Sequence, residues 1–371
     1  MKNPPGLPPL NPKPYLERLE ALIDVGHVLA AEDRQRRALL FEPLDRRPTI
    51  VTLRDDWRHV QHAQPPDWPA IPYRQAFRDP GKMLVAELQR AYEGALLRDD
   101  RAYTVRANYG LVIGASLFGC TVEQKDDEMP WVLPLPDRAT VVEMVARGVP
   151  DLNAGLGAQV WETEQRWLDW LAPYPNLRQT IRIGAPDAQG PFSLANHILG
   201  NDLFTWLVDD PDLVHDVLAL MTETYIAIVQ HHKALVNEPP DVGYSFSYRL
   251  RGGARISDDS AVLVSGRMYR QFAVPYNARL GAALHGVMVH FCGQGDQIFD
   301  PLTATPGVTS VNFGNPELQD FAARYALAQE RGVALLWDGP IPDVQQGITT
   351  GVIHKQIAPT WDAALSLARA L

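Results

Sequence analysis

Cysteine is scarce in this chain of 371 residues, which contains only Cys120 and Cys292. Two cysteines provide no disulfide framework and a fold of this size needs none, so we expect a reducing, cytoplasmic compartment. Uninterrupted apolar runs of about 18 residues are also missing, and residues 1–5 lack the apolar core of a signal peptide. The sequence therefore predicts neither a segment that crosses a bilayer nor a secretory leader.

Positive charge is in short supply as well. The chain has 34 lysines and arginines against 44 aspartates and glutamates, a formal net charge of -10, and no long basic run. Such a surface repels phosphate backbones and anionic lipid, which argues against nucleic acid and membrane partners and for a small-molecule substrate. Hydrophobic residues, by contrast, make up 46% of the sequence, a proportion typical of a globular protein with a large core.

The chain divides into an N-terminal extension and a regular core. Residues 1–14 are rich in proline and predict an extended arm, and residues 15–45 have a helical pattern, so an arm and helical extension are expected over residues 1–47. Over residues 48–371, short β-branched runs alternate with helical stretches, which indicates parallel strands joined by helical crossovers. The expected strands span residues 49–53, 103–106, 179–183, 243–246, 254–256, 286–290, 309–313 and 333–337.

The clearest helix is expected over residues 211–236, with Asp210 as its cap and Pro211 in its first turn. An open doubly wound sheet is the alternative architecture, and it would favour a glycine-rich phosphate loop after the first strand. Residues 53–57 there read Leu-Arg-Asp-Asp-Trp, which is no such loop. The pattern therefore predicts an α/β fold, a (β/α)₈ TIM barrel with an N-terminal helical extension, whose site lies at the C-terminal ends of the strands.

A histidine and a cysteine lie two residues apart at the end of an expected strand. Because residues i and i+2 of a strand point to the same side, His290 and Cys292 can present imidazole and thiolate to one ion. Zinc takes nitrogen and sulfur ligands, and a catalytic zinc site has about three protein ligands and one open position. The alternative is that Cys292 packs as an apolar side chain and His290 is a hydrogen-bonded one.

Carboxylates follow other expected strands. Asp258 and Asp259 come after residues 254–256, and two adjacent carboxylates can act as base and orienting group or as metal ligands; alternatively, one of them caps the next helix. Asp338 ends the last strand and is a candidate third metal ligand, because the chain has no third cysteine. Its alternative role is to start the turn at Gly339.

Two polar turns also follow strands. Asp187, Gln189 and Gly190 come after one of them, where a Gly-Pro turn can bring backbone amides or polar side chains to a substrate or cofactor. Such a turn can also be purely architectural. Asn108 follows another strand and has the same two interpretations.

Short motifs occur in a fixed order along the chain. His290-Phe291-Cys292-Gly293 is preceded by Gly190-Pro191 with Ala195 and Gly200, by Asp209-Asp210-Pro211-Asp212-Leu213-Val214, and by Asp258-Asp259 with Ser265, Tyr269, Phe272 and Pro275-Tyr276. In this order the motifs resemble the uroporphyrinogen decarboxylase-like superfamily over about residues 80–371. The resemblance implies a TIM barrel.

The superfamily contains true decarboxylases and methyltransferases that are linked to corrinoids or thiols. Its methyltransferase branch holds zinc through His-x-Cys and a distant third cysteine, and this chain keeps the first two and lacks the third. The resemblance therefore implies zinc bound by His290 and Cys292, with an oxygen ligand from Asp338 or from Asp258 or Asp259.

True uroporphyrinogen decarboxylases carry an N-terminal segment similar to Arg-Gln-Ala-Gly-Arg, whose arginines bind propionates and acetates. In this chain Arg54 stands beside Asp55 and Asp56, and these two carboxylates would repel a substrate with many carboxylates. Together with the net charge, this composition disfavours porphyrinogen decarboxylation.

The resemblance implies, as the leading hypothesis, a zinc-dependent methyltransferase that moves a methyl group between a small donor and a corrinoid or thiol. The corrinoid would be carried by a separate protein. The runner-up is a metal-free decarboxylase, a carboxy-lyase in which Asp258 or Asp259 stabilises a protonated ring intermediate. A third hypothesis is a non-catalytic barrel that only binds a ligand, and a homodimer is compatible with all three.

Overall fold

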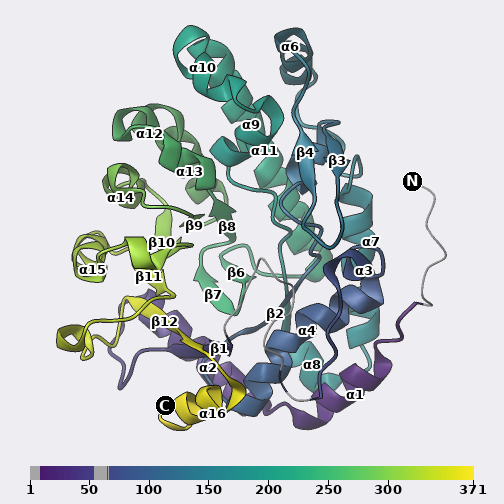
Figure 1. The fold of residues 1–371 in the computed structure, drawn as a ribbon, viewed down its shortest axis with the longest axis vertical. Helices are drawn as coiled ribbons and strands as arrows, with labels where there is room; N and C mark the ends of the chain where they lie inside the picture. The colour runs from purple at the N-terminus through teal and green to yellow at the C-terminus, as the bar shows by residue number, and fades with distance from the viewer. Residues whose placement is uncertain (1–8, 54–64, 66) are drawn as a thin grey trace.

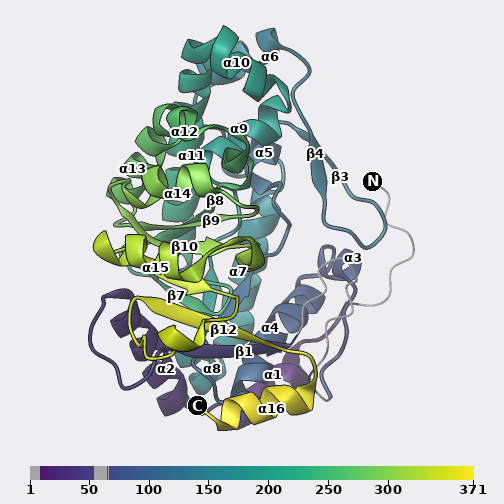
Figure 2. The same ribbon diagram turned by 60° about the vertical axis from the view of Figure 1, so that its left-hand side comes forward.

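The computed structural model describes residues 9–53, 65 and 67–371. The segment used above to compare this chain with true decarboxylases, residues 54–58, lies outside the described residues. The N-terminal extension contains two helices, α1 (Lys13–Leu22) and α2 (Val25–Leu39). They lie at the same end of the molecule as the C-terminal helix α16 (Trp361–Arg369), as Figures 1 and 2 both show.

In the described part of the chain, eight strands pair in parallel: β1 (Thr49–Leu53), β2 (Tyr103–Arg106), β5 (Ile181–Gly184), β8 (Ala254–Ser257), β9 (Val287–Phe291), β10 (Val308–Phe313), β11 (Ala334–Trp337) and β12 (Val352–Ala358). Six of them form one sheet in the order β1-β12-β11-β10-β9-β8, and β2 pairs with β5. These strands form a TIM barrel, so their C-terminal ends meet at one mouth.

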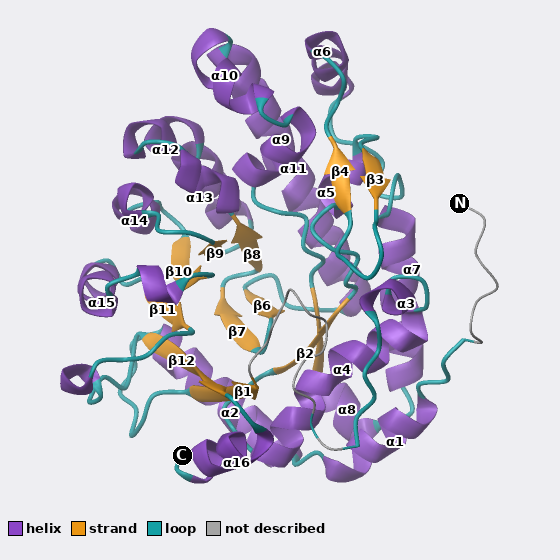
Figure 3. Cartoon of the chain, in the orientation of Figure 1, coloured by secondary structure: helices purple, strands orange, loops and turns teal. Residues whose placement is uncertain are grey.

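A short antiparallel hairpin, β6 (Val242–Ser245) and β7 (Tyr248–Arg251), lies inside the ring of parallel strands (Figure 3). Its side chains Tyr248 and Leu250 belong to a buried hydrophobic cluster together with residues of α2 and of four barrel strands: Ala38, Leu39, Ile50, Met288, Ala334, Leu336 and Ile353. The barrel interior is therefore packed with side chains rather than open as a pore.

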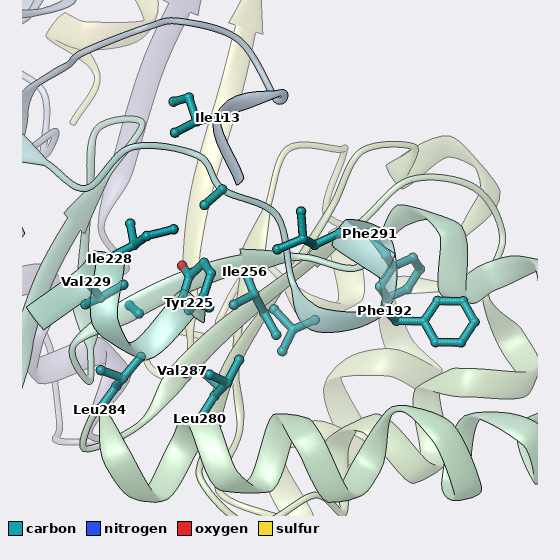
Figure 4. Packing of buried hydrophobic residues seen from close by; sticks show 14 of the residues in the cluster. Ile113, Phe192, Tyr225, Ile228, Val229, Ile256, Leu280, Leu284, Val287 and Phe291 are labelled. Carbon is teal, nitrogen blue, oxygen red and sulfur yellow. The ribbon is translucent and has the colours of Figure 1, made fainter. Parts of the chain in front are cut away.

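Helices cover the outer face of the barrel. Around β8 and β9 the cover comes from α11 (Pro211–Val236) and α13 (Val274–Ala283), where Tyr225, Ile228 and Leu280 pack near Ile256 and Val287 (Figure 4). The predicted helix at residues 211–236 is confirmed. Further helices are α3 (Tyr73–Ala76), α4 (Pro80–Leu97), α5 (Ile113–Leu117), α7 (Gly157–Leu171), α8 (Pro175–Thr180), α9 (Pro191–Leu199), α12 (Gly266–Phe272), α14 (Asp296–Thr303) and α15 (Phe321–Glu330).

Two helices, α6 (Arg138–Arg147) and α10 (Asp202–Asp209), lie at the end of the molecule away from α16 (Figures 1 and 2). The antiparallel pair β3 (Thr121–Glu123) and β4 (Trp131–Leu133) lies nearer the middle. An ion pair between Arg138 and Asp210 connects α6 with the start of α11. Asp210 is the N-cap residue of α11, as predicted, but its carboxylate is used in this ion pair and makes no cap hydrogen bond.

The predicted strand at 179–183 begins two residues too early, because Gln179 and Thr180 belong to α8, and β5 starts at Ile181. Two larger differences concern whole strands. The run at 243–246 is no barrel strand: it forms β6, and the turn after it leads directly into the antiparallel β7. The barrel strand that the pattern missed is β12, because Lys355 and Gln356 interrupt its apolar run. Lys355 is accommodated at this position by an ion pair with Asp338 on the neighbouring strand end. Within the described ranges, no helix is both long enough and apolar enough to cross a membrane.

Candidate metal centre at the barrel mouth

Three neighbouring strands, β8, β9 and β10, bring together the polar side chains that were predicted at strand ends in the second half of the chain. In the sheet, Ser257 of β8 and Asn312 of β10 both stand beside His290 of β9. Cys292 directly follows β9, on the side to which His290 points. Asp259 opens the 3-10 turn η1 (Asp259–Leu263) that follows β8. The C-terminal ends of β8 and β9 therefore direct Asp259, His290 and Cys292 to one point at the mouth.

Asp259, His290 and Cys292 form the one group of three or more His, Cys, Asp or Glu side chains in the described residues that could hold a metal ion. Their donor atoms all lie within 4.8 Å of one another. The Sγ atom of Cys292 is 3.5 Å from Nε2 of His290, and that Nε2 is 3.7 Å from Oδ1 of Asp259. Asp259 also fixes the backbone at this point, because its Oδ1 accepts a hydrogen bond of 2.7 Å from the amide of Cys292.

The orientation of the His290 ring is set from its other nitrogen. Nδ1 lies 2.7 Å from Oδ1 of Asn312, whose amide nitrogen in turn donates to the carbonyl of Leu336 at 2.8 Å. With its amide nitrogen acting as a donor, Asn312 uses its oxygen as an acceptor, so Nδ1 carries the proton and Nε2 presents a lone pair to the cluster. This is the arrangement of a metal-binding histidine with a supporting partner.

Burial and the neighbouring charges favour the neutral forms of His290 and Cys292 when no cation is nearby. Burial, followed by the positive charge of Arg255, lowers the pKa of His290. Partial burial and the negative charge of Asp259 raise the pKa of the Cys292 thiol to about 12. The cluster therefore presents an unprotonated imidazole nitrogen, a thiol and a carboxylate that face one another. A divalent cation can bind between these three groups, with loss of the thiol proton.

The distances in the cluster fit tetrahedral zinc. Bonds of about 2.3 Å to sulfur and about 2.0 Å to nitrogen separate those two ligand atoms by about 3.5 Å in a tetrahedral site. The observed distance between Sγ of Cys292 and Nε2 of His290 has this value. Among the described residues, Asp259, His290 and Cys292 are therefore the group that could hold zinc. Three side chains leave one coordination position for a substrate.

Asp258 lies apart from this cluster. Its side chain is fully buried and accepts a hydrogen bond of 2.8 Å from Asn277 of α13, and it is not part of the group formed by Asp259, His290 and Cys292. Burial raises its pKa to about 6. The adjacent carboxylates Asp258 and Asp259 therefore do not face a common point, and the structure joins only Asp259 to His290 and Cys292.

Asp187 is buried in a cluster of positive charge. One of its oxygens, Oδ2, is 3.0 Å from Arg106 and 2.8 Å from Arg255. The two guanidinium groups lie over the ring of Phe246, at 4.6 and 4.9 Å from its centroid, in the turn of the β6–β7 hairpin. Although burial opposes ionisation, Arg255 and Arg106 outweigh it and lower the pKa of Asp187 to about 2. Asp187 is thus an anchor that stays charged at neutral pH.

The other sequence candidates surround this anchor. Gln189 is buried and donates from its side chain to Asp187 at 3.1 Å, and the amide of Gly190 donates to the carbonyl of Ser257 at 2.8 Å. A Cβ at Gly190 would approach Asp258 to 2.9 Å, which explains why glycine suits this turn. Asn108 accepts from Arg106 at 3.2 Å and so extends the same network.

Asp338 lies on another side of the mouth. Its carboxylate accepts a hydrogen bond of 2.6 Å from Tyr248 and pairs with Lys355 at 2.7 Å, so it does not join the cluster of His290 and Cys292. Asp338 and Lys355 line a cavity of about 770 Å³ that reaches Gly314, the residue packed against Cys292. Asp338 therefore faces a space of the size that small ligands occupy, typically about 300–1,000 Å³.

Four residues that contact the candidates were not predicted from the sequence: Arg106, Arg255, Asn312 and Gly314. Arg106 and Arg255 belong to expected strands, where their position facing the barrel interior could have suggested a buried counter-charge. Asn312 also lies near the end of an expected strand, one strand from His290. For Gly314 no signal was available, because its importance depends on contact with Cys292 across two strands.

Comparisons with known proteins agree with this architecture. A family model for uroporphyrinogen decarboxylase (URO-D) matches residues 101–330. The methylcobamide:CoM methyltransferases MtbA of Methanosarcina acetivorans and Methanosarcina mazei are 24% and 25% identical over 342 residues, covering 85% of this chain and 86% of each relative. A solved structure, a methyltransferase from Methanosarcina mazei, matches 92% of this chain and 98% of its own with a TM-score of 0.65 and 20% identity. This similarity confirms the predicted barrel fold.

Proposed function

The chain belongs to the uroporphyrinogen decarboxylase (URO-D) family, and from this premise we propose that it is a zinc-dependent methyltransferase. It would move a methyl group between a small donor and a corrinoid or thiol, with the corrinoid carried by a separate protein. The observation that carries the proposal is the convergence of Asp259, His290 and Cys292 within 4.8 Å at the barrel mouth. The names of the methylcobamide:CoM methyltransferase relatives support the reaction class.

The roles of the side chains follow from their contacts. Asp259, His290 and Cys292 would hold zinc, which when bound acts as a Lewis acid on a methyl donor or lowers the pKa of an acceptor thiol. Asn312 keeps Nε2 of His290 directed at the cluster. The cavity lined by the paired Asp338 and Lys355 would hold the body of a small substrate beside the cluster.

The reaction class is tested by two assays on purified protein. We expect methyl transfer when methoxy or thiomethyl compounds are supplied with reduced cobalamin, or when methylcobalamin is supplied with small thiols such as coenzyme M. The change in the cobalamin absorption spectrum measures the transfer. With uroporphyrinogen we expect no coproporphyrinogen, because Asp258 is fully buried and contacts Asn277 rather than the mouth. Coproporphyrinogen formation at enzymatic rates would favour the decarboxylase, and inactivity in both assays would favour a barrel that only binds a ligand.

A second prediction concerns the glycine beside the proposed zinc ligand. A Cβ at Gly314 would collide with Sγ of Cys292, so Gly314→Ala should displace the sulfur and lower zinc affinity by about tenfold or more. Competition with a chromophoric chelator measures this affinity. Gly347→Ala is the matched control, because a Cβ there meets no atom within 4 Å. Equal zinc affinity in the two variants would argue against Cys292 as a ligand.

A further inference from the structure

A second large cavity lies at the N-terminal face of the barrel. It has a volume of about 660 Å³ and is bounded by the end of α7, the start of β5 and the β6–β7 hairpin. Ile181, in its wall, begins β5, whereas Asp187 follows the other end of that strand. The cavity is therefore separate from the metal cluster, and its volume is in the range of about 300–1,000 Å³ that is typical of small-molecule sites.

Much of the wall of this cavity is apolar. Leu168 and Leu171 of α7 face it, together with Ile181 of β5, Val236 at the end of α11 and Val242 of β6. A hydrocarbon group placed against these side chains would be removed from water, which contributes roughly 25 cal/mol for each Å² buried. The cavity is thus suited to a ligand with an apolar body.

Three arginines also line the cavity, and their partners differ. Arg182 is occupied, because it makes two hydrogen bonds of 3.0 Å to the carboxylate of Glu32. Arg178 and Arg249 contribute no side-chain hydrogen bond or ion pair to any other residue that the structure describes. Two guanidinium groups are therefore available to a ligand.

The nearby carboxylates do not neutralise these two arginines. Glu238 lines the cavity but pairs with Lys233, and Glu32 pairs with Arg182. Glu238 and Glu32 thus have their own cations, and Glu20 accepts hydrogen bonds from the backbone amides of Asn176 and Leu177 beside Arg178. Arg178 and Arg249 form no ion pair with a described carboxylate and remain as excess positive charge. In a chain with a net charge of -10, such a local excess on the wall of a cavity favours an anionic ligand.

We propose that this cavity is a second ligand site, which binds an organic anion with an apolar body. Arg178 and Arg249 would hold its carboxylate or phosphate, since guanidinium groups donate paired hydrogen bonds to such oxygens. Leu168, Leu171 and Val236 would contact its hydrocarbon part. The proposal does not depend on the methyltransferase activity.

Calorimetric titration of the full chain tests this site, with hexanoate and hexyl phosphate as probes for the two head groups. We expect at least one of these two probes to bind. Inorganic phosphate lacks the hydrocarbon chain and 1-hexanol lacks the anionic head group, so each should bind at least about tenfold more weakly. Arg249→Met should weaken the bound probe about tenfold. Leu168→Trp fills the apolar part of the cavity and leaves Arg178 and Arg249 in place, and it should also weaken binding of the probe about tenfold.

Arg147→Met is the control, because it removes an exposed arginine of α6, at the other end of the molecule. It should leave the affinity unchanged, and thermal melts should show that all variants remain folded. The proposal would be overturned if neither hexyl probe bound, or if inorganic phosphate or 1-hexanol bound as tightly as the better probe. Unchanged affinity in Arg249→Met or in Leu168→Trp would overturn it as well.

Discussion

Replacement of Cys292 by serine is expected to lower zinc content from close to one ion per chain to a small fraction of that value. In a zinc site with nitrogen, oxygen and sulfur ligands, the thiolate supplies much of the affinity. Loss of a residue that only supports a ligand lowers metal affinity by up to about 100-fold, so loss of the thiolate ligand itself should lower it by more. Methyl transfer should fall in parallel. Elemental analysis of protein purified without chelators, followed by the cobalamin assay, measures both quantities.

Cys120→Ser provides the control for this change. Cys120 is buried and outside the metal cluster, and burial raises its pKa to about 11, so its thiol is not reactive. The variant should keep its zinc and its activity even if its melting temperature falls. Metal-free wild-type protein, or a Cys292→Ser variant with full zinc content, would rule out the zinc site.

Replacement of Asp187 by asparagine is expected to destabilise the fold by about 3–5 kcal/mol, because it leaves Arg106 and Arg255 buried without a counter-charge. Urea unfolding at neutral pH measures this cost. Asp300→Asn is the matched control, since Asp300 also pairs with two arginines, Arg270 and Arg331, but its side chain is 52% exposed. Its loss should cost no more than about 1 kcal/mol. Equal effects of the two substitutions would contradict a structural role for the buried anchor.

The stability provided by Asp187 should also depend on pH. Its pKa is lowered from 3.8 to about 2 in the folded protein, so the carboxylate stabilises the fold above the unfolded value. This contribution, about 2 kcal/mol from the shift alone, should be complete at pH 5 and above and should be lost as the pH falls toward 2. The difference in unfolding free energy between wild type and Asp187→Asn should shrink over that interval. A difference that stays constant down to pH 2 would mean that the ion pairs do not set the pKa.

Much of the barrel could be predicted because its parallel strands are buried on both faces. Strands such as 287–291 and 334–337 are short apolar runs bounded by turns, and α11 has proline in its first turn and regular apolar spacing. β12 was not predicted because Lys355 interrupts its apolar run. The ion pair with Asp338, on the neighbouring strand end, stabilises this lysine, and such a contact cannot be read from the local sequence. The β6–β7 hairpin was assigned to the barrel wall because a strand inside the barrel and a strand in its wall have the same local sequence pattern.

The site was predictable only where its residues are close in sequence. The alternation of side chains along a strand gives the common direction of His290 and Cys292 without any structure. The choice among Asp258, Asp259 and Asp338 as the oxygen donor required the positions of three strand ends, and the structure brings Asp259 to the cluster. The counter-charges of Asp187 could not be assigned because Arg106 and Arg255 are 81 and 68 residues away in the chain.

X-ray absorption spectroscopy at the zinc edge of the purified protein tests the central proposal most directly. The account predicts one sulfur neighbour at about 2.3 Å and nitrogen or oxygen neighbours at about 2.0–2.2 Å. In Asp259→Asn the sulfur distance should persist while zinc binds more weakly, and in Cys292→Ser the sulfur contribution should vanish. Absence of bound zinc, or zinc without a sulfur neighbour in the wild-type protein, would contradict the proposed centre at Asp259, His290 and Cys292.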